Sequence, residues 1–160
     1  MLAVKLICVG KLKEKFYIDA VREYAKRLGG YCSLEIDELP EAKLSAVPGE
    51  AEINQALDKE RAAIEAKIPK GAAVIAMCIE GEQPDSEDLA AMLADYAVRG
   101  VSRLCFIIGG SFGIHPEIKR GADRRLSMSK MTFPHNLARV ILLEQIYRGF
   151  KIAEGGKYHK

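Results

Sequence analysis

The sequence predicts an α/β protein with an open, mostly parallel sheet and helices on both faces. Short apolar runs rich in β-branched residues alternate five times with segments whose apolar residues recur at helical spacing. Such alternation builds parallel sheets, and their ligands bind at the carboxyl ends of the strands. The chain of 160 residues fits one domain, 1–160, without an internal repeat or a low-complexity tract.

The first half of the chain supplies three strands and two helices, separated by glycine- and proline-containing turns. In order, these are strand 2–9, helix 16–28, strand 32–36, helix 53–68 and strand 72–79. A loop with two prolines spans 40–49. The run over 72–79 is apolar throughout, which predicts a central strand covered on both faces.

The second half continues the alternation, and its elements are helix 86–99, strand 104–108, a short helix from 116, an extended segment 125–128 and helix 134–152. Asp85 or Ser86 is the predicted cap of the first of these helices, because both side chains accept bonds from free backbone amides. Thr132 is the predicted cap of the last, with Pro134 in its first turn.

Composition excludes several classes of protein. Hydrophobic residues make up 49% and charged residues 29%, and no apolar run reaches 18 residues, so no membrane segment is expected. The four cysteines are dispersed without a C-x-x-C pair, which favours a reducing cytoplasm over disulfides. The three histidines show no metal-ligand spacing, so we expect no metal.

The net charge of +2 conceals an uneven distribution along the chain. Residues 1–30 carry seven basic and three acidic side chains, residues 31–114 carry seven and fifteen, and residues 115–160 carry ten and four. Two basic ends around an acidic middle suit a polyanionic partner if the ends meet in space. Solvated charged faces would give the same pattern, so the charges alone do not decide.

The glycine-rich stretch GGSFG at 109–113 follows a strand and precedes a helix. Glycines there allow a ligand to approach the backbone closely, although a simple tight turn would also need them. The spacing differs from the G-x-G-x-x-G fingerprint of dinucleotide sites and lies after the fourth strand, which disfavours a nicotinamide oxidoreductase.

The last predicted helix is apolar around most of its circumference, which indicates burial on several sides. In a domain of this size, self-association is a natural way to cover the second face. His135 and Arg139 are four residues apart on one face and can contact an anion, or else form a solvated first turn. Glu144 and Arg148, also four apart, predict an intrahelical ion pair.

Four stretches together resemble the RlmH family, the bacterial ribosomal large-subunit pseudouridine N3-methyltransferases of the SPOUT class. They are IIGGSFG at 107–113, LSMSKMTFPH at 126–135, ARVILLEQIYR at 138–148 and the terminal YHK. The resemblance covers the whole chain. It implies a C-terminal trefoil knot, which residue patterns alone cannot indicate because ordinary connections are unknotted.

The resemblance also implies a cofactor and its binding residues. S-adenosylmethionine would lie against backbone groups of three loops, where glycines leave room for the adenine and ribose. These groups belong to Met77, Gly109, Gly110, Gly113, Met128, Ser129, Lys130, Met131, Thr132 and Phe133. Cys78 stands where we expect an acidic residue in relatives, and Gly149 where we expect alanine.

The implied reaction is methyl transfer to N3 of a pseudouridine, position 1915 of 23S ribosomal RNA, on the assembled ribosome and by a homodimer. His135, Arg139, Tyr158 and His159 are the candidates to take the N3 proton or stabilise the resulting anion. Gly155 and Gly156 would be a hinge that closes the tail over the substrate. A non-catalytic RNA-binding or ribosome-associated module with the same fold is the alternative.

Overall fold

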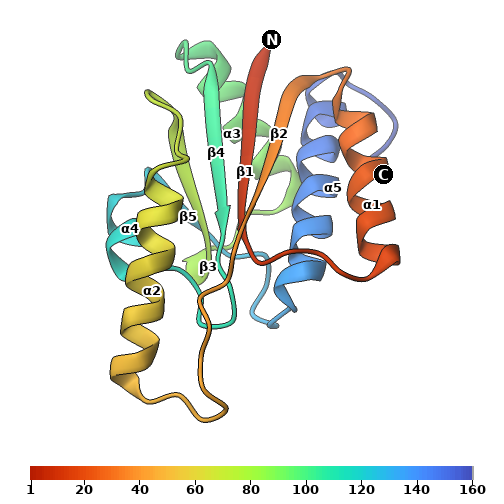
Figure 1. Cartoon of the computed structure of the whole chain (residues 1–160). Coiled ribbons are helices and arrows are strands. Elements are labelled where there is room, and N and C mark those ends of the chain that lie inside the picture. The colour runs from red at the N-terminus through yellow and green to blue at the C-terminus, as the bar shows by residue number, and fades with distance from the viewer. Residues whose placement is uncertain (160) are drawn as a thin grey trace.

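The computed structural model describes residues 1–159 and confirms the predicted alternation of strands and helices (Figure 1). The strands are β1 (Leu2–Val9), β2 (Cys32–Leu39), β3 (Ala73–Glu82), β4 (Arg103–Ile108) and β5 (Arg124–Leu126). The helices are α1 (Lys15–Leu28), α2 (Glu50–Glu65), α3 (Ser86–Val98), α4 (Pro116–Gly121) and α5 (His135–Ala153). Residues 40–49 contain neither a helix nor a strand, as predicted.

The five strands form one sheet in the order β2-β1-β4-β3-β5, and every pairing is parallel. The central strand is β4, whereas the sequence pattern predicted this position for β3. Both strands are apolar runs with a partner on each side, so hydrophobicity alone does not distinguish their positions. Because all strands run in one direction, their carboxyl ends meet at the lower edge of the sheet in Figure 1.

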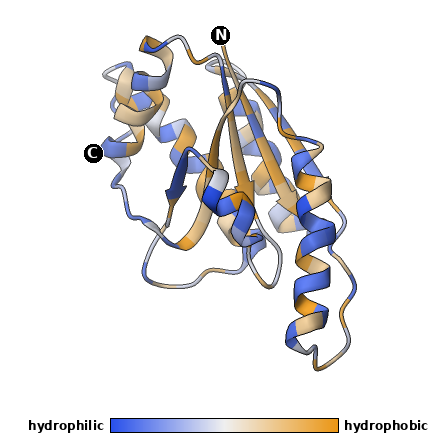
Figure 2. Ribbon diagram, turned by 90° about the vertical axis from the view of Figure 1, so that its left-hand side faces the viewer, coloured by the Kyte–Doolittle hydropathy of each residue, from blue (hydrophilic) through white to orange (hydrophobic). Residues whose placement is uncertain are grey.

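Helices α1, α3 and α5 cover one face of the sheet, and α2 and α4 cover the other (Figure 1). Successive residues of β1 alternate between the two layers: Leu6 and Cys8 join the core under α3 and α5, while Ile7 and Val9 join the core under α2 and α4. Strands β1 and β4 are accordingly hydrophobic along most of their length, whereas the edge strand β5 is mostly hydrophilic (Figure 2). Within residues 1–159, no helix is long and apolar enough to cross a membrane.

The two predicted helix caps have different outcomes. Asp85 caps α3, and its carboxylate accepts a bond from the Asp88 amide at 2.7 Å while the Asp88 carboxylate accepts one from the Asp85 amide. The predicted Thr132 cap is wrong, because α5 begins at His135 with Pro134 in the cap position. The backbone of Pro134 is still extended there, so the segment before it cannot join the helix.

The chain after β5 crosses close to the far end of β3. The Ser127 amide donates to the Glu82 carbonyl at 2.7 Å. A Cβ atom at Gly81 would lie 2.7 Å from backbone atoms of Arg125 and Leu126, so only glycine permits this approach. The trefoil knot implied by the resemblance stays a prediction.

Candidate functional site

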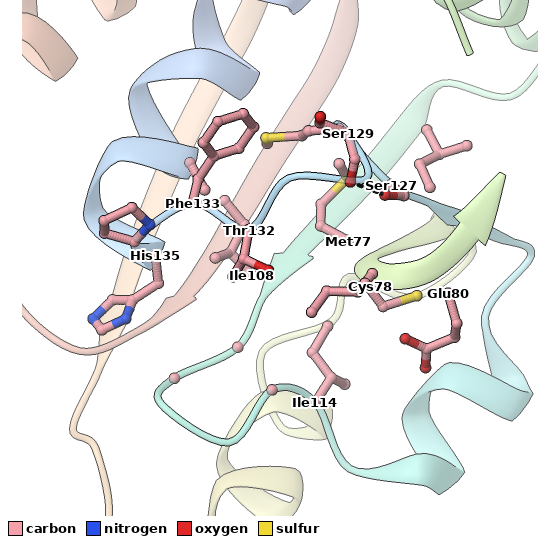
Figure 3. Close-up of a pocket in the computed structure, with 18 of the residues that line it drawn as sticks. Met77, Cys78, Glu80, Ile108, Ile114, Ser127, Ser129, Thr132, Phe133 and His135 are labelled. Carbon is pink, nitrogen blue, oxygen red and sulfur yellow. Dashed lines mark hydrogen bonds between the residues drawn. The ribbon is translucent and has the colours of Figure 1, made fainter. Parts of the chain in front are cut away.

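A cavity of about 550 Å³ lies at the carboxyl edge of the sheet, where ligands of parallel α/β proteins bind (Figure 3). Three segments form its walls: the end of β3, the glycine loop 109–113, and the segment 126–135 that leads into α5. Apolar side chains such as Ile108 and Leu126 line its interior. The volume and the mainly apolar lining are typical of small-molecule sites.

The glycine loop forms a wall that side chains would disrupt. A Cβ atom at Gly109 would lie 2.3 Å from the Gly113 carbonyl oxygen. Gly110 and Gly113 form an isolated β-bridge, and Gly113 has a φ of 77°, a conformation that side chains disfavour. The loop therefore presents its backbone to the cavity in a fixed shape.

The residues predicted to bind the cofactor come together around this cavity, with one exception. Those that line it are Met77, Gly109, Gly110, Gly113, Met128, Ser129, Met131, Thr132 and Phe133. Lys130 is exposed and does not line the cavity. The chain bends at Lys130 and Met131, and this local turn, which sequence resemblance does not reveal, leaves Lys130 outside the lining.

The far end of the cavity contains Cys78 and two charged residues, Glu80 and Lys119, that the sequence did not single out. Cys78 and Glu80 lie there, opposite His135 (Figure 3). Lys119 of α4 also lines the cavity, and its ammonium group is 2.5 Å from the Glu80 carboxylate. This hydrogen bond is the main cause that lowers the pKa of Glu80. The sequence contained a signal for these residues, because Cys78 and Glu80 follow Met77 and Lys119 follows the glycine loop.

His135 lies at the other end of the cavity (Figure 3), and Glu41 lies close to it near Gly10. A Cβ atom built on Gly10 would be 3.7 Å from His135 Nε2 and 3.9 Å from a Glu41 carboxylate oxygen. Glu41 accepts bonds from the Ser111 hydroxyl at 2.6 Å and the Ser111 amide at 2.9 Å. The pKa of Glu41 is lowered, chiefly by that hydroxyl and further by the amide and His135.

Arg139 does not line the cavity and is buried rather than solvated, so its predicted contact with a substrate anion stays a prediction. The side chain is 2% exposed, and its guanidinium group donates to Glu38 at 2.6 Å and to the Gly10 carbonyl at 3.1 Å. Arg139 lies one helical turn after His135 on α5, but its side chain points into the protein interior. It fastens α5 to the ends of β1 and β2.

The C-terminal tail packs on the distant end of α5. The Tyr158 hydroxyl donates to Glu144 at 3.2 Å, and the Arg148 guanidinium lies 4.8 Å from the Tyr158 ring centre. His159 Nδ1 is 3.3 Å from Arg148. The predicted ion pair between Glu144 and Arg148 is confirmed at 2.6 Å. An α-helix rises about 1.5 Å per residue, so Arg148 lies roughly 20 Å along α5 from His135.

An open parallel sheet with a glycine-walled cavity at its carboxyl edge defines an α/β protein that binds a small organic ligand. The profile described as "Predicted SPOUT methyltransferase" matches residues 2–159. The chain belongs to the SPOUT methyltransferase family, as its sequence motifs indicated.

Relatives of similar length resemble this chain along almost its whole length. Proteins named "Ribosomal RNA large subunit methyltransferase H" from Bifidobacterium adolescentis, Clostridioides difficile and Listeria monocytogenes are 50%, 48% and 44% identical. Each alignment covers 98% of this chain and 99% of the relative.

Solved structures support the fold at much lower sequence identity. A probable methyltransferase from Bordetella pertussis superimposes with a TM-score of 0.60 at 13% identity, covering 92% of this chain and 94% of the other. A probable methylase family protein from Haemophilus influenzae gives a TM-score of 0.59 at 12% identity, covering 100% and 72%. The chain therefore shares its fold with these two structures.

Proposed function

We propose that this protein transfers a methyl group from S-adenosylmethionine to N3 of a pseudouridine in large-subunit ribosomal RNA. The observation that carries the proposal is the convergence of three separate segments, each predicted from the resemblance, on one cavity. The names of the three relatives support ribosomal RNA as the substrate. The choice of pseudouridine 1915, and of assembled ribosomes over free RNA, rests on the motif resemblance.

The cavity fits the proposed cofactor in size and chemistry. About 550 Å³ is within the range for ligands of nucleoside size. Backbone groups of Gly109 and Met77 and the apolar side chains of Ile108 and Phe133 suit an adenine ring, which has polar edges and apolar faces. The bound cofactor supplies an electrophilic methyl group, and the protein must hold the acceptor nitrogen in line with it.

We assign His135 as the residue that accepts the N3 proton. Of the four candidates for this role, it is the one that lines the cavity, and an imidazole ordinarily titrates near neutral pH. When N3 accepts the methyl group, the imidazole of His135 would take the N3 proton. Arg139 acts indirectly, because it fixes the first turn of α5 on which His135 stands.

Tyr158 and His159 join such a site only if they come from a second copy of the chain. Within one chain they lie at the opposite end of α5 from His135. We therefore propose a homodimer in which two α5 helices face each other in opposite directions. The half-buried side chains of Leu137, Val140 and Ile141 supply an apolar surface for this contact.

The arrangement in two copies has a direct test by complementation. His135→Ala lacks the proposed base, and a chain shortened by residues 158–160 lacks the tail, so each alone should be inactive. Mixed dimers contain one complete site, with His135 from one chain and the tail from the other. Mixing the two variants should restore activity, whereas two inactive variants that stay inactive when mixed contradict the arrangement.

The basic ends of the chain provide a surface for RNA phosphates. Helix α1 packs along α5, so the basic residues of these two helices lie on the same face of the sheet, while those of α4 and β5 lie on the other face and at the far edge (Figure 1). Binding that neutralises phosphates releases counterions and weakens as salt rises. We expect the affinity for ribosomes to fall steeply between 50 and 200 mM salt, roughly tenfold or more.

The deciding experiment for the proposed function uses ribosomes that lack the modification. The protein is incubated with them and with labelled S-adenosylmethionine, and the RNA is digested and analysed by mass spectrometry. We expect the label on N3 of one pseudouridine. Absence of the label from ribosomal RNA would sink the proposal, and protein-free RNA as a parallel substrate shows whether the assembled particle is needed.

A further inference from the structure

Exposed apolar side chains gather at the mouth of the cavity. Among residues 1–159, seven large hydrophobic side chains are exposed, and three of these line this one cavity. They are Phe112 at 48% exposure, Ile79 at 65% and Met131 at 74%. Single exposed apolar residues are ordinary, but a group of them at the opening of one cavity marks a binding surface.

Phe112 stands on a loop that is held rigid. On one side, both the amide and the hydroxyl of Ser111 bond to Glu41. On the other side, the Gly113 amide donates to the Gly110 carbonyl at 3.1 Å. An aromatic ring on a braced loop loses little conformational entropy when a ligand packs against it, so it is well suited to binding.

The surroundings of Phe112 favour a nucleic-acid base over other flat ligands. Lys130 is exposed next to Met131 and forms no ion pair with any residue of the described part of the chain. The segment that carries Lys130 and the glycine loop border the cavity from different sides (Figure 3). In proteins that bind single-stranded nucleic acids, exposed aromatic rings stack on bases and cations meet the phosphates.

We propose that Phe112 stacks on the acceptor base after it has left the RNA helix, and thereby positions it between the cofactor cavity and His135. This inference rests on the proposed function and adds a substrate-positioning residue to it. Enzymes that modify a base commonly take it out of the stack and hold it against aromatic or apolar side chains. The ring of Phe112 provides such a face at the entrance to the cavity.

The test compares substitutions that distinguish the effect of the aromatic ring from the effect of an apolar side chain of similar size. Phe112→Tyr keeps the ring, and Phe112→Leu keeps an apolar side chain without it. Val98→Ala is the matched control, because Val98 is 86% exposed at the end of α3 near the opposite edge of the sheet. Thermal unfolding and calorimetric titration with S-adenosylmethionine come first, and we expect all three variants to match the wild type within about twofold in cofactor affinity.

Methyl transfer to ribosomes lacking the modification then gives KM and kcat for each variant. Loss of base stacking should raise KM for ribosomes about tenfold to a hundredfold in Phe112→Leu, while Phe112→Tyr and Val98→Ala stay near the wild type. Unchanged kinetics in Phe112→Leu would overturn the inference. A loss of cofactor affinity as large as the increase in KM would also overturn it, because Phe112 would then contact the cofactor.

A binding measurement keeps this inference separate from the proposed function. If the wild-type protein transfers no methyl group, the proposed function fails, and co-sedimentation with large ribosomal subunits still compares the variants. Weaker binding by Phe112→Leu than by Phe112→Tyr would then support base stacking. Equal binding by the two would refute it.

Discussion

Replacing Arg139 with methionine separates a structural role of this residue from a catalytic one. The guanidinium group is buried and joins three parts of the protein: α5, the Glu38 carboxylate at the end of β2, and the Gly10 carbonyl after β1. Methionine keeps the apolar stem and loses both bonds. The Leu12 amide still donates to Glu38 at 2.8 Å, so the carboxylate keeps one partner.

The expected loss of stability follows from the burial of the two groups. Removing one partner of a fully buried ion pair costs about 3 to 5 kcal/mol. The Glu38 side chain is 34% exposed, so water compensates part of this loss. We therefore expect the free energy of unfolding to fall by about 2 to 4 kcal/mol. For 160 residues this corresponds to a decrease in Tm of roughly 5 to 15 °C.

The pair also makes stability depend on pH. Partial burial raises the pKa of Glu38, but the bonds from Leu12 and Arg139 outweigh it and hold the pKa below the ordinary 4.5. A lowered pKa in the folded state stabilises the protein above the unfolded-state value and is lost as pH falls through the folded value. The difference between wild type and Arg139→Met should therefore shrink as pH falls below about 4.5.

Urea unfolding followed by circular dichroism at pH 7 and pH 3.5 measures these quantities. Arg61→Met is the control, because its pair with Glu65 is exposed and should contribute little to stability. If Arg139→Met is as stable as the wild type but fails to transfer methyl groups at 25 °C, the buried ion pair is not what Arg139 contributes. The sequence-based assignment to the substrate would then be correct.

Three further predictions concern the cavity and its surroundings. N-ethylmaleimide at pH 8 should modify Cys78 first, because Cys78 is partly exposed while the other three cysteines are buried, although burial raises the pKa of its thiol as it raises that of Cys105 to about 12. S-adenosylmethionine should protect Cys78, and equal labelling with and without S-adenosylmethionine in peptide mass spectra would contradict the cofactor site. Ser111→Ala should lower the free energy of unfolding at pH 7, because the Ser111 side chain lowers the pKa of Glu41 in the folded protein. This loss should disappear as pH falls below about 4.5. A difference in urea unfolding that is independent of pH would exclude this linkage. Deleting residues 158–160 should leave Tm and cofactor affinity nearly intact but abolish methyl transfer, and full turnover would show that the tail has no role.

The sequence predicted the order of elements and most of the cavity because both depend on local rules. Apolar periodicity located each strand and helix, and parallel strands bring the ends of β3 and β4 to one edge whatever their order in the sheet. Met77 and Gly109 follow from that rule together with the resemblance. The capping of α3 by Asp85 is also local, since the bonds join residues three apart.

The errors and omissions concern residues whose environment is set by distant parts of the chain. The burial of Arg139 depends on Glu38 and Gly10, which are about 100 and 130 positions earlier. Thr132 has the right residue type for a cap, but its segment stays extended to line the cavity. Glu41 was hidden in a loop with no motif, and its role emerges only from its bonds to Ser111.

The crossing of the chain beside Gly81 has a consequence for the order of events during synthesis. Strand β5 pairs only with β3, which precedes it by about 50 residues, and the cavity wall over 126–135 comes later still. During translation, strand β3 is synthesised well before the cavity wall formed by residues 126–135. A nascent chain therefore cannot hold a cofactor until most of the protein has left the ribosome. Only a chain that includes residues 126–135 has all the walls of the cavity.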